Sequence, residues 1–464
     1  MQVDSREKLY RLEIMGQKST EKILYLNNFQ LDSFGLNDGQ KLFLKIGFTS
    51  QKVKVSKQNI DSDNTKLYLS PEAYNGLWHY KGESMSLTFS SNSKLIFGPT
   101  IGITVSWNTW RKIDKIYAIK KRAILALEKG LFFYCFHYNK IDLENNLVKA
   151  YILNPKTYQW KKKYLPYPQV LYHRSTFPFK KDFEDTNSDN VYNRIWLNQN
   201  IEKINNTIYF DKWNVYKALA KSEDAVEFQP PSQLLTKSTL KQFIDRYSRC
   251  YVKNIYGRGG RQVLKVEKSK SDFICSTGGK KIRNWRFTNL ENLYEFLQDQ
   301  LGKDLIIQKG ISLARLNDNP FDIRVLVQKN IEGNWVISAL SFRVADKNAV
   351  ITNCAAGAKE ICVPPGENPL GSGLSLKSLE NFTNKTLSAL EKYYGPLGEL
   401  GLDIGLDTNG KIWLIEANSQ PSSRGYREAA SKEVLRDIFG LPLDYAKYLI
   451  KKQYIKAYQE SGGY

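Results

Sequence analysis

The spacing of apolar and polar residues divides the chain into four segments. In the first 92 residues, short stretches alternate between the two kinds, as in Lys41–Ile46 and Leu67–Leu69. Turn-forming residues, such as Asn37-Asp38-Gly39, separate these stretches. Alternation with a period of two is typical of short β-strands with one buried face. We therefore predict a small β-rich domain over residues 1–92.

The pattern then becomes that of an open α/β sheet. The apolar run Ile96–Val105 predicts a strand, and apolar residues at helical spacing predict a helix over Arg111–Lys129. Gly130 ends this helix, and Leu131–Phe136 predicts the next strand. The segment Trp160–Arg174 is predicted to be an ordered loop. These elements indicate an α/β domain over residues 93–205.

Two further α+β segments follow, and we place them at residues 206–304 and 305–464. In the first, helices over 211–220 and 240–247 precede a strand, a glycine-rich loop at Tyr256–Arg261 and a second strand. The second begins with a strand at Leu305–Gln308. Its other predicted elements are the strands 323–328, 335–342, 399–406 and 411–416, a helix over 376–394, and a helical tail over 428–458 broken near Pro442.

Composition adds a strong positive charge to this outline. The 464 residues carry a formal net charge of +21, from 68 Lys and Arg against 47 Asp and Glu. Such a charge attracts anions in general, from nucleotides to acidic peptides. The basic residues are spread along the chain without a run of five, which disfavours a dedicated nucleic-acid arm. A generally lysine-rich surface is the alternative explanation.

Cysteine and histidine usage argues against zinc and for a cytoplasmic setting. The five cysteines form no C-x-x-C pair, and the chain has three histidines. A scattered, odd set of thiols indicates a reducing compartment. The first residues lack the features of a signal peptide, and the longest nearly apolar run, Leu95–Val105, is about half a membrane span. We expect a protein without a membrane span.

A candidate metal site lies on the predicted hairpin near the C-terminal end. Asp403 lies on its first strand, and Glu416 and Asn418 lie at the end of its second. Residues two apart on a strand face the same side, so these oxygen ligands should gather. Magnesium takes such ligands together with phosphate oxygens. A solvated polar hairpin end is the alternative.

Candidate phosphate-binding groups occur upstream of the hairpin. Lys253 precedes a loop that contains Gly257, Gly259 and Gly260, whose backbone can approach a phosphate closely. The loop lacks the Gly-Lys-Ser/Thr of a Walker A motif, and a flexible hairpin is the alternative. Arg324 and Arg343, on successive predicted strands, could stabilise developing phosphoryl charge.

Taken together and in this order, these motifs resemble the ATP-grasp superfamily, in particular RimK-type carboxylate–amine ligases. The motifs are Lys253 with its glycine loop, Asp322-Ile323-Arg324-Val325, Thr352-Asn353 and a final stretch from Asp403 to Pro421. The long phrase FDIRVLVQKNIEGNWVISALSFRVA, with ELGLDIGLDTNGKIWLIEANSQP after it, is similar to the YheC/YheD family of endospore coat-associated proteins. This resemblance implies an α/β domain followed by two α+β lobes that close on ATP.

The resemblance also implies residue roles. Lys212, Lys253 and the loop glycines would bind the nucleotide, and a hinge that includes Gln308, Lys309 and Ile311 would bracket the adenine. Arg324 would contact the terminal phosphate, and Arg343 and Asn353 would lie near the transferred phosphate or the acceptor. The metal ligands would be Asp403, Glu416 and Asn418. The loop departs from the family pattern at Asn254, Arg258 and Gln262, a change that we expect to affect turnover more than binding.

The function implied is a Mg-ATP-dependent ligase that joins a carboxylate to an amine through an acyl phosphate. ATP and Mg²⁺ would be its cofactors, and its unknown substrates could include an acidic peptide. The resemblance extends to partners among coat proteins and to a sporulation role. A non-catalytic ATP-binding scaffold of the coat or envelope is the alternative function.

Overall fold

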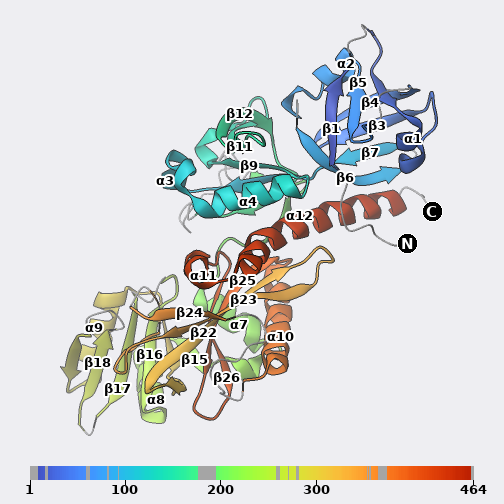
Figure 1. Cartoon of the computed structure of the whole chain (residues 1–464). Helices are drawn as coiled ribbons and strands as arrows, with labels where there is room; N and C mark the ends of the chain where they lie inside the picture. The colour runs from blue at the N-terminus through green and yellow to red at the C-terminus, as the bar shows by residue number, and fades with distance from the viewer. Residues whose placement is uncertain are drawn as a thin grey trace. The chain divides into compact units, whose positions relative to one another are not determined.

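The chain folds into two compact units, each described here by itself (Figure 1). Unit 1 contains residues 1–204, 329–334 and 439–464, and unit 2 contains residues 205–328 and 335–438. The computed structural model describes residues 9–15, 19–58, 63–80, 83–91, 93–175, 195–257, 262–269, 271–277, 282–352, 354, 357–363 and 374–460.

The first part of unit 1 is a closed β-barrel, drawn in blue in Figure 1. Its strands are joined in the order β1-β5-β2-β4-β3-β7-β6. Their bounds are β1 Leu9–Ile14, β2 Ile23–Leu26, β3 Lys41–Ile46, β4 Thr49–Lys57, β5 Lys66–Leu69, β6 Ser84–Ser91 and β7 Lys94–Phe97. The short helices α1 Asn28–Phe34 and α2 Pro71–Asn75 lie between strands. Buried and exposed residues alternate along β3 and β4, so the predicted β-rich N-terminal region is confirmed.

The predicted single strand Ile96–Val105 is wrong, because the chain forms two strands there. β7 belongs to the barrel, whereas β8 Thr100–Thr104 belongs to the next sheet. Gly98 separates them with a φ of +121°, a conformation that L side chains rarely adopt. Pro99 follows it and lacks the N–H that a continuous ladder would need.

The second part of unit 1 is the expected α/β sheet, with the strand order β10-β11-β9-β8-β13-β14. The strands β8, β9 Phe132–Phe136, β13 Val170–His173 and β14 Glu202–Lys203 are parallel, and β14 lies at one edge of the sheet. The hairpin of β11 Leu147–Leu153 and β12 Trp160–Pro166, together with β10 Ile141–Asp142, extends one side. The prediction of a loop from residue 160 is therefore wrong over β12, whose residues pair with β11 throughout.

The helix predicted over Arg111–Lys129 is shorter in the structure. α3 Trp107–Arg111 and a 3₁₀ turn precede α4 Tyr117–Glu128, so the first turns are separate elements. α4 buries Ile119, Ala123 and Ala126, and Gly130 follows it at a φ of +65°, as a helix end requires.

The C-terminal helix α12 Lys432–Glu460 corrects another prediction, because it continues through Pro442. A proline inside a helix leaves the carbonyl four residues earlier without its backbone donor. Here that carbonyl belongs to Ile438, and the side-chain Nε2 of Gln328 donates to it at 2.9 Å. From Phe439 onwards the helix belongs to unit 1, where Lys129 Nζ binds Asp444 at 2.6 Å.

Unit 2 contains two sheets. The first has the strand order β15-β20-β16-β17-β18-β19. Its strands are β15 Ser232–Leu234, β16 Arg249–Asn254, β17 Val263–Lys268, β18 Phe273–Thr277, β19 Asn284–Phe287 and β20 Leu305–Lys309. Leucines and phenylalanines of α8 Lys237–Arg246 and α9 Leu290–Leu301 pack with these strands in one core. β20, predicted at the start of the last segment, thus pairs with β15 and β16 of this sheet.

The second sheet of unit 2 has the strand order β24-β23-β22-β25-β26, with β21 Arg315–Leu316 paired to β22. Its strands are β22 Asn319–Lys329, β23 Trp335–Val344, β24 Lys359–Val363, β25 Glu399–Leu406 and β26 Ile412–Asn418. α7 Lys212–Ala220 and α10 Leu376–Tyr394 supply residues to the core of this sheet, and α11 Arg424–Ala429 contacts β24. The predicted mixed α+β architecture is confirmed, whereas the exact domain bounds stay a prediction.

Candidate functional site

A pocket in unit 2 collects most of the residues proposed from the sequence. It has a cavity volume of about 110 Å³, within about 850 Å³ of empty space that includes open solvent. Residues of both unit 2 sheets and of α7 line it. The predicted residues among them are Lys212, Lys253, Gly257, Gln308, Lys309, Ile311, Arg343, Asp403 and Glu416.

The predicted acidic hairpin is formed by β25 and β26. Asp403 lies opposite Glu416 in the register of the two strands, and the register shifts just after this pair. Both carboxylates therefore reach the pocket. Asn418 lies two residues farther along β26, opposite Gly401, and is not among the lining residues.

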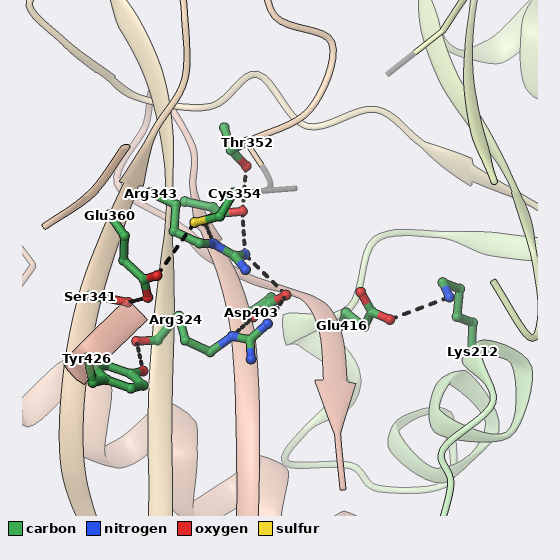
Figure 2. Close-up of polar contacts among 11 residues, drawn as sticks. Lys212, Arg324, Ser341, Arg343, Thr352, Cys354, Glu360, Asp403, Glu416 and Tyr426 are labelled. Carbon is green, nitrogen blue, oxygen red and sulfur yellow. Dashed lines mark hydrogen bonds and ion pairs between the residues drawn. The ribbon is translucent and has the colours of Figure 1, made fainter. Parts of the chain in front are cut away.

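Asp403 is held by two arginines from neighbouring strands. Arg324, opposite it on β22, donates through Nε to Oδ1 and through Nη2 to Oδ2, the latter at 2.9 Å. Arg343 Nη2 lies 3.1 Å from Asp403 Oδ2. Figure 2 shows the Asp403 carboxylate directed at these two guanidinium groups, whereas the Glu416 carboxylate faces Lys212.

Arg343 is fixed from its other side by Asp322. Its Nε and Nη2 each donate to one Asp322 oxygen at 2.6 Å, and the Thr352 hydroxyl donates to Asp322 as well. All three side chains are buried. A buried ion pair with extra hydrogen bonds holds its members in one geometry, and removing one member typically costs about 3–5 kcal/mol.

The charges of this cluster determine the protonation of Asp403. Burial by itself would raise the pKa of the carboxyl group, but the positive charges of Arg324 and Arg343 and their hydrogen bonds outweigh burial and lower it. Asp403 is therefore an anion at neutral pH. Arg343, next to two carboxylates, has a pKa well above its usual value and remains charged.

Two lysines face the acidic hairpin. Lys212 is the first residue of α7, whose N-cap Asp211 accepts a hydrogen bond from Asn214 N at 2.8 Å. Its Nζ lies 3.5 Å from Glu416 Oε1 and donates to the carbonyl of Gly257. The helix start thus places a cation beside the carboxylate.

Lys253 lies on β16 and is almost entirely buried. Its Nζ donates to Gln308 Oε1 at 2.6 Å. Burial, and secondarily the charge of Lys212, lowers the pKa of Lys253 to about 8. An anionic ligand would favour its protonated form, so this lysine is suited to bind phosphate.

The predicted hinge residues follow Gln308 at the end of β20. Gln308 Nε2 donates to the Ser232 hydroxyl at 2.9 Å, and Lys309 N donates to the carbonyl of Pro231 at 2.9 Å. Ile311 lies just beyond, on the pocket wall. These contacts position the segment between the two sheets.

Some site residues were not predicted, and others fall outside the described residues. Gly259, Gly260 and Asn353 belong to the second group. The pocket wall also includes unpredicted apolar residues, namely Val263, Leu313, Val350, Ile351 and Ile415. An apolar residue has no chemical signature in a sequence, whereas Asp322 belongs to the recognised Asp322-Ile323-Arg324-Val325 motif and shares one face of β22 with Arg324.

The donor set of the pocket fits a magnesium–phosphate group. Glu416 and Asp403 supply hard oxygen ligands, and a carboxylate oxygen can accept more than one contact. Lys212 and Lys253 supply positive charge on the opposite side. No group of three or more His, Cys, Asp and Glu side chains that could hold a metal ion occurs in the described part of the chain.

Comparison with known sequences identifies the family. The model of the family described as YheC/D-like ATP-grasp matches residues 200–449, which is more than half of the chain. The chain belongs to this family. Its fold is therefore the ATP-grasp fold, as the sequence motifs indicated.

Two curated relatives come from Bacillus subtilis (strain 168). The endospore coat-associated protein YheD is 26% identical over 363 residues, which cover 76% of this chain and 78% of YheD. The endospore coat-associated protein YheC is 23% identical over 333 residues, covering 71% of this chain and 91% of YheC.

Solved structures with a similar fold include the ATP-grasp ligase PsnB complexed with a precursor variant, Mg and ADP. Its TM-score is 0.43 at 14% identity, and the match covers 76% of this chain and 99% of PsnB. The VanG D-Ala:D-Ser ligase from Enterococcus faecalis has a TM-score of 0.44 at 11% identity, and the match covers 76% of this chain and 99% of the VanG chain.

Among the described helices of this chain, none is long and apolar enough to cross a membrane.

Proposed function

We propose that this protein is a Mg-ATP-dependent carboxylate–amine ligase. Family membership supports ATP as the nucleotide, and the pocket composition supports the chemistry. The observation that carries the proposal is the convergence of Asp403 and Glu416 with Lys212, Lys253 and Arg343 on one pocket. Opposed carboxylates and cations suit a metal-bound polyphosphate.

The proposed reaction has two balanced steps. A substrate carboxylate oxygen attacks the γ-phosphorus of ATP, the bond to the bridging oxygen breaks, and ADP leaves with its electron pair. An amine then attacks the acyl carbon of the acyl phosphate, and inorganic phosphate leaves as the amine loses a proton. Phosphoryl transfer of this kind depends on positioning and charge stabilisation rather than on a covalent nucleophile.

Some residues of this chain would bind the nucleotide, and others would stabilise the charge that develops during transfer. Lys253 and Lys212 would hold the phosphates, and Gln308, Lys309 and Ile311 would contact the base. Magnesium, when bound by Asp403, Glu416 and Asn418, would neutralise phosphate charge and orient the transferred group. By the family motif, Gly257, Gly259 and Gly260 would also contact the phosphates. Arg324 would contact the terminal phosphate, and Arg343 and Asn353 would lie near the transferred phosphate or the acceptor.

We further propose a link to the spore coat and a cytoplasmic site of action. The first rests on the similarity to two endospore coat-associated proteins, and the second on the five scattered cysteines of the sequence. The substrates are an unidentified carboxylate and an unidentified amine. The high positive charge of the chain favours an acidic peptide among the candidates.

The proposal is tested by ADP release from purified protein with Mg-ATP and a panel of amino acids and acidic peptides. Glu416→Gln removes a metal-binding charge and is expected to reduce acceptor-stimulated turnover on the order of 100-fold. Glu380→Gln makes the same change at an exposed position of α10 and serves as the matched control. Unchanged turnover in the Glu416 variant would refute the mechanism.

A non-catalytic ATP-binding scaffold is the second candidate. The observation that favours it is the pairing of Asp403 with both arginines, which occupies a proposed metal ligand. Mg-dependent ATP binding without turnover on any member of the panel would support this function and exclude the ligase.

A further inference from the structure

Unit 1 contains a second hollow, separate from the ATP-grasp pocket. It has a volume of about 400 Å³ and is lined by Trp107, Trp110, Lys140, Lys149, Tyr151 and Lys162, together with Arg111. We call it the lysine–aromatic groove. α3 and the β11–β12 hairpin, both labelled in Figure 1, form its walls.

Two lining residues follow the carboxyl ends of parallel strands. Trp107 opens the helix that follows β8, and Lys140 belongs to the 3₁₀ turn after β9. Ligands of open α/β sheets bind beyond the carboxyl ends of the strands.

The hairpin face of the groove alternates cations with aromatic rings. Lys149 lies opposite Tyr164, and Tyr151 lies opposite Lys162. In each pair the ammonium nitrogen lies over the partner ring, at 5.4 Å and 5.3 Å from its centroid. Lys140 lies 5.3 Å above the Trp107 ring in the same way. The rings therefore hold the ammonium groups in defined positions along the groove.

These cations lack a neutralising carboxylate within the described part of the chain. Lys140, Lys149 and Lys162 form no ion pair with any described Asp or Glu, and the Arg111 guanidinium donates to the neutral Asn108 side chain at 3.0 Å. A group of four like charges around one hollow creates a local positive potential, which attracts an anionic ligand.

A backbone edge borders the same cations. β12 pairs with β11 on one side, and on its other side the Tyr164 carbonyl receives a contact from His79 Nδ1 at 3.1 Å. Because alternate residues of an antiparallel strand direct their N–H and C=O groups to the same side, Lys162 directs its backbone groups outward as Tyr164 does. The 3₁₀ turn Trp78–Tyr80 contacts this edge at Tyr164, so the part that can accept an additional extended strand lies around Lys162.

We propose that the lysine–aromatic groove binds an acidic peptide as an extended segment along the outer edge of β12. Backbone hydrogen bonds at Lys162 would hold the peptide, and Lys149, Lys162 and Lys140 would bind its carboxylates. This inference is independent of the proposed ligase activity, because it concerns binding to unit 1. If the ligase proposal also holds, the same peptide is its candidate substrate.

The shape of the groove favours a peptide over a single-stranded nucleic acid. Nucleic acids of that kind need several exposed rings on which successive bases stack. Trp110 is buried, with 5% of its surface exposed, and the face of Trp107 is covered by Lys140. A lysine occupies one face of each of the two exposed rings, Trp107 (42% exposed) and Tyr164 (47% exposed), whereas a peptide with regularly spaced carboxylates can use both the cations and the strand edge.

The test measures binding of fluorescein-labelled (Glu-Ala)₅ to the full chain by anisotropy. Lys149→Gln with Lys162→Gln should weaken binding at least tenfold. Lys156→Gln with Lys161→Gln removes the same charge from the same hairpin, at its turn and on the opposite face, and should change binding less than twofold. Equal losses of affinity in the two double variants would show that only the overall charge matters and would overturn the proposed site.

Two competitors test the rest of the proposal. The peptide (Glu-Pro)₅ has the same number of carboxylates but lacks half of the backbone N–H groups, so it should compete at least fivefold less well than unlabelled (Glu-Ala)₅. Equal competition would overturn strand addition. A ten-nucleotide oligo-dT should compete weakly, and a tighter affinity than that of the peptide would reassign the groove to nucleic acid.

Discussion

At the scale of single residues, the candidate site is organised by buried charges that hold one another in place. Asp403 is a hydrogen-bond acceptor for two arginines, and Arg343 is in turn oriented by Asp322. Lys253 differs from these arginines, because burial lowers its pKa and disfavours its charged form. Its protonation should therefore respond to the ligand, whereas the arginines should stay charged throughout.

The lowered pKa of Lys253 predicts a pH dependence of nucleotide affinity. The lysine of the free protein loses its proton as pH rises through about 8, whereas phosphate charge would retain the proton in the complex. Affinity should thus be constant below this pH and fall above it, by at most about tenfold per pH unit. Calorimetric titrations of Mg-ADP from pH 7 to 9.5 measure this.

Lys253→Met is the accompanying variant. It should bind Mg-ADP more weakly at pH 7 and should lose the decline above pH 8, because it removes the titrating group. A decline of the same size in this variant would assign the titration to another residue. Exposed Lys221→Met, on the C-cap of α7, provides the matched control.

At the scale of elements, helix starts and strand pairing place the functional groups. α7 begins at Lys212 because Asp211 caps it, and this start directs Lys212 toward Glu416. The hairpin of β25 and β26 places Asp403 opposite Glu416. The β11–β12 hairpin similarly fixes the Lys–Tyr pairs of the groove in unit 1.

Loss of the Asp211 cap predicts a measurable destabilisation of unit 2. Asp211→Ala leaves the N–H of Asn214 without its acceptor, which should reduce the free energy of unfolding by about 1 kcal/mol. Differential scanning calorimetry should show a decrease in melting temperature of about 2–4 °C. Asp211→Asn keeps an acceptor oxygen and should lose less than half as much. Equal losses would attribute the effect to the charge of Asp211.

At the scale of the whole molecule, the chain order and the structural units do not coincide. Unit 1 combines the first 204 residues with a short segment at 329–334 and the last residues of α12. Phe439, Leu443 and Ile450 of this helix are buried, and the Arg122 guanidinium lies 4.8 Å from the Phe439 ring. The stability of the N-terminal region therefore depends on the C-terminal helix.

Phe439→Ala tests this dependence. Removing a fully buried ring should reduce the free energy of unfolding by about 3–5 kcal/mol. The loss should appear in the thermal transition of unit 1, whereas the transition that Mg-ADP shifts, assigned to unit 2, should stay within experimental error. Ile455→Ala, at a residue of the same helix with 39% exposure, should have a small effect. Destabilisation of the nucleotide-sensitive transition alone would contradict the division into units.

Much of this protein could be predicted from local sequence signals. Three of these signals depend on only a few neighbouring residues. They are the alternation of apolar and polar residues in the first domain, the strand–helix–strand pattern after it, and the Asn409-Gly410 turn. The family motif named Asp403, Glu416, Lys212 and Lys253, and the pocket contains all four. Their roles at the nucleotide and the metal are predictions.

Tertiary structure decided what depends on residues far apart in the chain. α12 continues through Pro442 because the side chain of Gln328 replaces the missing backbone donor. β20 belongs to the first sheet of unit 2 because it pairs with β15 and β16. The arginines around Asp403 and the apolar pocket wall likewise appear only when separate strands pack together. Local periodicity and motifs thus determine which elements form and which chemistry they carry, whereas long-range contacts determine their partners, because those contacts form only between residues that folding brings together.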